Sequence, residues 1–207
     1  MRISYAITVC NEFVEIQKLI PTLLNNKAEE DEVVVLYDSK NGDPKIEEYL
    51  KKNSLNEEFK LHSGEFENHF ADWKNKLTEM CTGDYIFQID ADETPNPILL
   101  NNIHAILEAN QNIEVYHVPR VNTVEGLTDE HIKKWKWRVD DKKWINWPDY
   151  QMRIWKNIPE IKWRNKVHEV LEGHKSFSAL PPQEELALYH PKNIERQEKQ
   201  NNYYDTL

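Results

Sequence analysis

The sequence has little cysteine, little glycine and no long apolar run. Its two cysteines, Cys10 and Cys81, are too few for a disulfide framework and have no other ligand at zinc spacing, so we expect buried thiols. Five glycines and ten prolines exclude a fibrous or low-complexity chain. The sequence has no N-terminal leader and no apolar run near the ~20 residues of a membrane span. We therefore expect a soluble, cytoplasmic protein without stable membrane insertion.

Positive charge is also scarce. Lysine and arginine total 26 against 36 aspartates and glutamates, which gives a formal net charge of -10. Dedicated nucleic-acid-binding proteins usually display a basic surface that neutralises phosphates, so nucleic acid is not an expected partner. Hydrophobic residues make up 39% of the chain, which excludes wholesale disorder. At 207 residues the chain suits one folded domain that can recruit a cation.

The first half of the chain alternates β-rich runs with segments of helical period. The patterns predict strands at 3–9, 32–38, 59–63 and 82–90, and helices at 12–26, 44–53, 69–81 and 97–110. Such alternation, with continuous runs of Val and Ile, predicts an α/β fold with a mostly parallel central sheet flanked by helices.

The second half differs in texture. Strands are expected at 113–121, 150–156 and 161–164, and the tail at 193–207 is polar enough to form a solvated helix or to fray. Six of the seven tryptophans lie between Trp135 and Trp163. These rings either close a small core or stack against a sugar, and we expect core packing for most of them.

The stretch YIFQIDADET, residues 85–94, ends a predicted strand with Asp90, Asp92 and Glu93. Ligands of parallel sheets bind beyond the carboxyl ends of the strands, where Asp38 also falls. In an extended segment Asp90 and Asp92 face the same side and can share a cation. Oxygen ligands without thiols favour Mg²⁺ or Mn²⁺, completed by a diphosphate. Capping of a helix that begins near Pro95 is an equally open alternative for Asp92 and Glu93.

Six segments occur in an order that resembles the inverting family-2 glycosyltransferases. They are YAITVCNE, VVVLYDSKNGDP, FADWKNKLTEMCTGDYIFQIDADE, YQMRIWKN, IKWRNKVHEVLEG and LYH. The resemblance implies the GT-A fold with its Asp-x-Asp motif and a small Trp-rich lobe on the acceptor side. It divides a single domain, residues 1–207, into a nucleotide-sugar-binding half (1–110), an acceptor and catalytic half (111–192) and a polar tail (193–207).

The resemblance also implies which residues contact a nucleotide-sugar donor. A UDP-sugar is favoured because the Asp38 loop resembles that of uridine-binding proteins, and a carboxylate there can accept a hydrogen bond from a base N–H; GDP or another nucleotide is the alternative. Lys74 stands where the family often has arginine, so its contact with a phosphate would not be bidentate. The alternative for Asp72 and Lys74 is a position on an exposed helical face without a role in binding. The implied donor-binding residues are Thr8, Val9, Asn11, Glu12, Asp38, Ser39, Asp72, Lys74, Asn75, Asp90, Ala91, Arg153 and His168.

The same resemblance implies a metal site and a catalytic base. Asp92, Asp90 and His190 are the expected ligands of Mn²⁺ or Mg²⁺, with Asp90 alternatively on the ribose. Glu169, in a Val-His-Glu segment, is the first candidate base, and Asp149 is the second. Arg153 and His190 each have a purely structural role as an alternative.

The resemblance implies that a sugar is transferred with inversion at its anomeric carbon. An acceptor hydroxyl, on a glycan, a lipid-linked carrier or another molecule, attacks the sugar opposite the leaving diphosphate while a carboxylate removes its proton. A non-catalytic nucleotide-sugar binder is the main rival. A sugar nucleotidyltransferase is less favoured, because TVCNEFVE, residues 8–15, contains neither glycine nor a cation.

Overall fold

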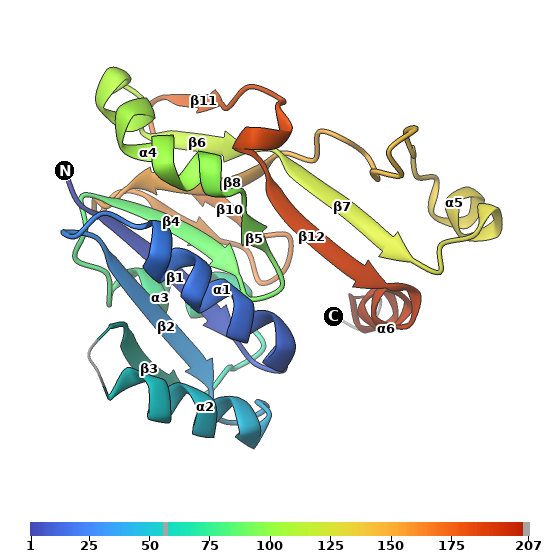
Figure 1. Cartoon of the computed structure of the whole chain (residues 1–207), viewed down its shortest axis with the longest axis horizontal. Coiled ribbons are helices and arrows are strands. Elements are labelled where there is room, and N and C mark those ends of the chain that lie inside the picture. The colour runs from blue at the N-terminus through green and yellow to red at the C-terminus, as the bar shows by residue number, and fades with distance from the viewer. Residues whose placement is uncertain (56–57, 205–207) are drawn as a thin grey trace.

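The computed structural model describes residues 1–55 and 58–204, without the side chains of residues 200 and 202–204. A central seven-stranded sheet has the order β11-β6-β8-β4-β1-β2-β3 (Figure 1). β1 runs parallel to β2 and β4, and β3 runs parallel to β2, whereas β8 is antiparallel to both of its neighbours. The predicted mostly parallel α/β sheet is confirmed. Its strands are β1 (Ile3–Val9), β2 (Glu32–Asp38), β3 (Lys60–Gly64), β4 (Tyr85–Asp90), β6 (Val115–Val118), β8 (Gln151–Lys156) and β11 (Phe177–Ala179).

Helices cover both faces of this sheet. α1 (Phe13–Asn26), α2 (Pro44–Ser54) and α4 (Pro97–Ala109) pack on one face, and α3 (Phe70–Thr78) packs on the other. α3 ends three residues before the predicted limit at Cys81, which nevertheless stays buried in the same layer. Cys10, expected in the core, is only half-buried at the end of β1.

A second sheet of three strands extends from the central one as an arm (Figure 1). It contains β5 (Thr94–Pro95), β12 (Leu188–Asn193) and β7 (Arg120–Glu125). The single strand predicted at 113–121 is in fact two, β6 and β7. Pro119 separates them, because proline has no N–H to continue a ladder; its carbonyl oxygen instead accepts a hydrogen bond from the Leu188 N–H at 2.9 Å.

The remaining elements belong to neither of these two sheets. β9 (Lys162–Arg164) and β10 (Val170–Glu172) form a hairpin that contacts α3, and α5 (Asp129–Trp135) opens the Trp-rich span. The predicted polar tail forms α6 (Ile194–Tyr204), which follows β12 directly. None of the helices in the described part of the chain combines the length and apolar character that a membrane crossing needs. The cytoplasmic location stays a prediction.

Candidate active site

The carboxyl ends of β1, β2 and β4 meet at one edge of the sheet, beside the arm. A cavity of about 550 Å³ opens there. Its lining brings together Lys74 from α3, Asp90 and Asp92 from the end of β4, and Glu169 from the loop before β10. Further lining residues are Arg153, His168, His190, Trp137 and Trp163. Most of the predicted acids and bases therefore line one cavity.

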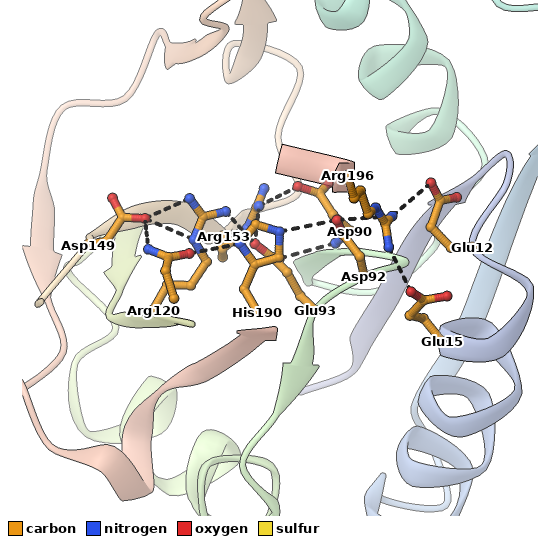
Figure 2. A network of polar contacts seen from close by, with 11 residues as sticks. Glu12, Glu15, Asp90, Asp92, Glu93, Arg120, Asp149, Arg153, His190 and Arg196 are labelled. Carbon is orange, nitrogen blue, oxygen red and sulfur yellow. Dashed lines mark hydrogen bonds and ion pairs between the residues drawn. The ribbon is translucent and has the colours of Figure 1, made fainter. Parts of the chain in front are cut away.

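Acids and arginines alternate along the floor of this site, and we call Asp90, Arg153, Glu93, Arg120 and Asp149 the ladder (Figure 2). Arg153 Nη2 lies 2.5 Å from Asp90 Oδ2 and 2.6 Å from Glu93 Oε1. Arg120 Nη1 lies 2.8 Å from the same Glu93 oxygen, and its Nη2 lies 2.6 Å from Asp149 Oδ2. Burial raises the pKa of Asp90, but the attraction of Arg153 outweighs burial and holds this pKa well below its usual range.

Glu93 does not start a helix. Its side chain is 0% exposed and one carboxylate oxygen lies between the two arginines. The N-cap of α4 is Asn96, whose Oδ1 accepts from Ile98 N at 2.9 Å, with Pro97 at the first helical position. The structure thus excludes the helix-capping alternative for Asp92 and Glu93.

Asp92 and His190 contact each other in the lining of the cavity. Asp92 Oδ2 lies 3.1 Å from His190 Nε2, and His190 Nδ1 lies 2.8 Å from Asn122 Oδ1. Asn122 uses its Nδ2 to donate to Asp149 Oδ2 at 2.8 Å, so its oxygen is the atom that faces His190. His190 must then donate from Nδ1, which leaves the Nε2 lone pair of a neutral ring directed at Asp92.

In a neutral His190 ring two acceptor atoms face each other at this distance, so a positive species belongs beside them. An imidazolium proton, a metal cation and the Arg196 guanidinium, whose Nη2 lies 3.3 Å from the same Asp92 oxygen, can each fill this role. Burial raises the pKa of Asp92, but the hydrogen bond and charge of His190, with the charge of Lys192, outweigh it and lower the pKa to about 2. Asp92 is therefore a permanent anion at neutral pH.

The residues present fit a hard divalent cation. A separation of 3.1 Å between the Asp92 oxygen and the His190 nitrogen suits two adjacent ligands of an octahedral ion whose bonds are about 2.1 Å long. Among the described residues, no group of three or more His, Cys, Asp and Glu side chains is arranged to hold a metal. Mg²⁺ in proteins usually has one or two protein ligands, and water and substrate phosphate supply its other ligands.

Lys74 and Glu169 form an ion pair across the cavity. Lys74 is 7% exposed, and its Nζ also lies 4.5 Å from the centroid of the Trp163 ring. The structure therefore places Lys74 beside the first candidate base. The exposed-face alternative for Lys74 is wrong.

Asp149, the second candidate base, is held differently. Its Oδ2 accepts from Arg120 Nε at 2.9 Å, from Arg120 Nη2 and from Asn122, and its Oδ1 accepts from Gln151 Nε2 at 3.0 Å. Asp149 is not among the residues that line the cavity. Its carboxylate serves to orient Arg120 and Asn122.

The turn after β1 borders the site through Glu12. Glu12 Oε2 accepts from the backbone N–H groups of Cys10 and Asn11, both at 2.9 Å. Burial, together with the nearby charge of Asp92, raises the pKa of Glu12 against the lowering effect of these hydrogen bonds. Thr8 and Val9 belong to the end of β1, where Val9 is buried.

The Asp38 carboxylate organises its own loop. It is 3% exposed, and its Oδ1 accepts from the backbone N–H groups of Lys40, Asn41 and Phe66 at 3.0–3.3 Å. Its Oδ2 accepts from Asn41 Nδ2 at 2.9 Å. Ser39 lies exposed in this loop and donates to Gly64 O. A base N–H that binds Asp38 must therefore share an oxygen with these donors.

Three other predicted donor-binding residues lie away from the cavity lining. The Asp72 side chain is 77% exposed beside His69. Asn75 joins α3 to β9 through two hydrogen bonds of 2.9 Å: its Nδ2 donates to the carbonyl oxygen of Trp163, and its Oδ1 accepts from the Trp163 N–H. Ala91 is buried behind the acids. His168, in contrast, lines the cavity and has a positive φ of 53°.

Four residues of the site were not predicted: Glu93 in its buried role, Arg120, Asn122 and Arg196. The Arg196 guanidinium contacts Glu12, Glu15 and Asp92 from α6 (Figure 2). Alternating polar positions in β7 were the only available signal for Arg120 and Asn122.

The four tryptophans of the Trp-rich span (residues 133–147) are half-buried and belong to neither hydrophobic core cluster. The core packing expected for most of the tryptophans is therefore not found: of the six between Trp135 and Trp163, Trp155 and Trp163 are the two that are buried in the core. Trp135 stacks on His131 with ring centroids 5.0 Å apart, and Trp144 meets Trp147 edge-on at 4.9 Å. Trp137 from this span lines the cavity, as does Trp163 from β9.

In open α/β sheets, ligands bind in the crevice beyond the carboxyl ends of the strands, and the acid-lined cavity lies at this place in the present fold. The chain belongs to glycosyl transferase family 2, whose sequence profile matches residues 4–168. No curated protein matches it significantly.

Solved structures of TarS from S. aureus share the fold. The 1-349 fragment of TarS superposes with a TM-score of 0.57 at 15% identity, over 92% of this chain and 60% of that chain. Its complex with UDP-GlcNAc gives a TM-score of 0.58 at 14% identity, over 93% of this chain and 59% of that chain. Another structure of S. aureus TarS gives a TM-score of 0.59 at 14% identity, over 92% of this chain and 37% of that chain. The expected GT-A type fold is thereby confirmed, and the present chain spans about 60% of the TarS fragment.

Proposed function

We propose that this protein is a metal-dependent, inverting glycosyltransferase that moves a sugar from a nucleotide-diphosphate donor to an acceptor hydroxyl. The observation that carries the proposal is that one cavity brings together the Asp92 and His190 side chains, whose 3.1 Å contact suits two ligands of one cation, and an ion-paired carboxylate, Glu169. Family membership supports the reaction class. The TarS complex with UDP-GlcNAc supports a UDP-sugar as the donor to be tried first.

Asp92 and His190 would hold Mn²⁺ or Mg²⁺, with Asp90 fixed beside them by Arg153. The bound cation would neutralise the charge that develops on the leaving diphosphate. Asn122 fixes the His190 ring so that Nε2 faces Asp92. The protein thus orients its two ligands before any donor arrives.

Glu169 would remove the proton of the acceptor hydroxyl. An ionised carboxylate is only an acceptor, and Lys74 holds this one at the cavity wall. Asp149 is less suited, because four donor groups already occupy its oxygens. We therefore assign the base to Glu169.

Hydrolysis of a panel of nucleotide sugars, with Mn²⁺, with Mg²⁺ and with a chelator, tests the proposal. Wild-type protein should hydrolyse at least one donor slowly, and both chelator and Asp92→Ala should stop it. Turnover that ignores both changes would contradict the metal assignment. Donor binding without turnover, even with glycan and lipid-linked acceptors added, would favour the non-catalytic binder.

A further inference from the structure

Arg196 connects the last helix to the first turn of the chain. Its Nη1 lies 2.7 Å from Glu15 Oε1, at a sequence separation of 181 residues. Its Nη2 lies 3.4 Å from Glu12 Oε1 and 3.3 Å from Asp92 Oδ2 (Figure 2). One guanidinium therefore contacts three carboxylates: Glu12 at the N-cap of α1, Glu15 in its first turn and Asp92 from the loop after β4.

The contact on Asp92 uses the same oxygen that faces His190. A divalent cation on Asp92 would lie about 2.1 Å from that oxygen, within a few ångströms of the guanidinium nitrogen. Like charges repel strongly at such a separation in a partly buried site. Arg196 and the divalent cation are thus alternative partners of Asp92.

Arg196 does not leave the site when it leaves Asp92. The Glu15 contact is the shortest of the three and involves the other nitrogen of the fork, Nη1. The next turns of α6 contribute Gln197 and Asn201 to the cavity lining. A guanidinium held here has N–H donors to offer to phosphate oxygens, which arginine binds well.

We propose that Arg196 is an exchangeable counter-ion: it neutralises Asp92 while no divalent cation is bound, and it passes to the donor diphosphate once the cation takes Asp92. This inference rests on the proposed function. It adds a donor-binding residue from α6 and makes that helix responsive to the cation.

The first test compares Mn²⁺ binding without nucleotide, followed by the electron paramagnetic resonance signal of free Mn²⁺. Arg196→Gln should bind Mn²⁺ about fivefold more tightly than wild type, the effect of removing one partly exposed competing ion pair. Arg196→Lys, which keeps the charge, should stay near wild type. The exposed Arg138→Gln is the matched control for the loss of one positive charge. An Arg196→Gln protein that binds Mn²⁺ no more tightly would overturn the exchange.

The second test measures UDP binding by calorimetry at saturating Mn²⁺. Here the sign reverses: Arg196→Gln should bind UDP about tenfold more weakly, as expected for one lost charge-assisted hydrogen bond. Unchanged UDP affinity would refute the transfer to the diphosphate. Wild-type protein that binds neither Mn²⁺ nor UDP would refute the proposed function itself, which separates the two failures.

A third measurement needs no variant. In wild-type protein, Mn²⁺ alone should speed amide hydrogen exchange in the first turn of α6, because the Asp92 contact is lost. Added UDP should slow that exchange again. Exchange in α6 that is indifferent to Mn²⁺ would contradict the inference even if Arg196→Gln failed to fold.

Discussion

Lys74 and Glu169 form an ion pair across the cavity, although 95 residues separate them in the sequence. The pair joins α3 to the loop before β10 and places a carboxylate at the wall of the site. The ion pair thus fixes the orientation of the carboxylate that we propose as the base.

Replacement of Glu169 by glutamine should lower kcat by about 10²- to 10⁴-fold, the usual contribution of a general base. UDP binding should be retained, because the change does not touch Asp92 or His190. Steady-state kinetics and calorimetry on the same preparation separate the two effects. Full activity in this variant would move the base role to Asp149.

Asp149→Asn is the companion variant. Because Asp149 orients Arg120 and Asn122, its loss should cost about 1–3 kcal/mol of folding free energy, measured by urea unfolding. Activity per folded molecule should fall less than in the Glu169 variant. The opposite ranking would reverse the assignment of the two carboxylates.

Asn122→Leu should weaken Mn²⁺ binding without altering either metal ligand. The change removes the acceptor for His190 Nδ1, and the loss of such an orienting partner typically costs 10- to 100-fold in metal affinity. Equilibrium dialysis with Mn²⁺ measures the effect, with Asn102→Ala on the surface of α4 as the control. Affinity equal to wild type would mean that the Asn122 contact does not fix the ring.

Arg153→Met should destabilise the fold strongly. It leaves Asp90 and the fully buried Glu93 without their shared guanidinium, and breaking a buried ion pair costs about 3–5 kcal/mol. Chemical denaturation should register this loss, while Arg164→Met at an exposed position should change little. A small effect of the Arg153 change would show that Arg120 alone neutralises Glu93.

Stability should decline in acid partly through Glu32. Burial raises the pKa of this group, but hydrogen bonds from Lys60, Ser4 and Thr82 outweigh burial and lower the pKa to about 2. Because the folded pKa lies below the unfolded one, about 4.3, this contribution is present above that value and is lost as the pH falls toward 2.

The matching variant is Glu32→Gln. Its free energy of unfolding at pH 7 should be about 2 kcal/mol lower than that of wild type. This difference between the two proteins should shrink below pH ~4, where Glu32 begins to take up a proton. Urea unfolding at several pH values measures the gap, and Glu29→Gln at an exposed position is the control. A gap that stays constant down to pH 2.5 would contradict the role of ionised Glu32.

Much of the fold was predictable, because its information is local. Period-two and period-3.6 patterns located β1, β2, β4, α1 and α4 to within a few residues. The arm was missed at Pro119, where a single residue without an N–H turned one predicted strand into two strands of different sheets.

The same difference between local and distant information decides which residues of the site were predictable. Asp92 and His190, separated by 98 residues, were predicted to meet through family resemblance, and the structure brings them together. Arg120, Asn122 and Arg196 were not predicted, because nothing in the local sequence tells which distant carboxylate an arginine will reach.

The ladder has a consequence for how this sequence can change over time. Its three acids and two arginines share so many contacts that a substitution at one rung alters the effect of a substitution at the next. Mutational drift at these five positions should therefore be epistatic. In a library that randomises Glu93 and Arg120 together, folded variants should be those in which the charges at the two positions still balance. The five ladder positions should therefore change together in evolution and not one at a time.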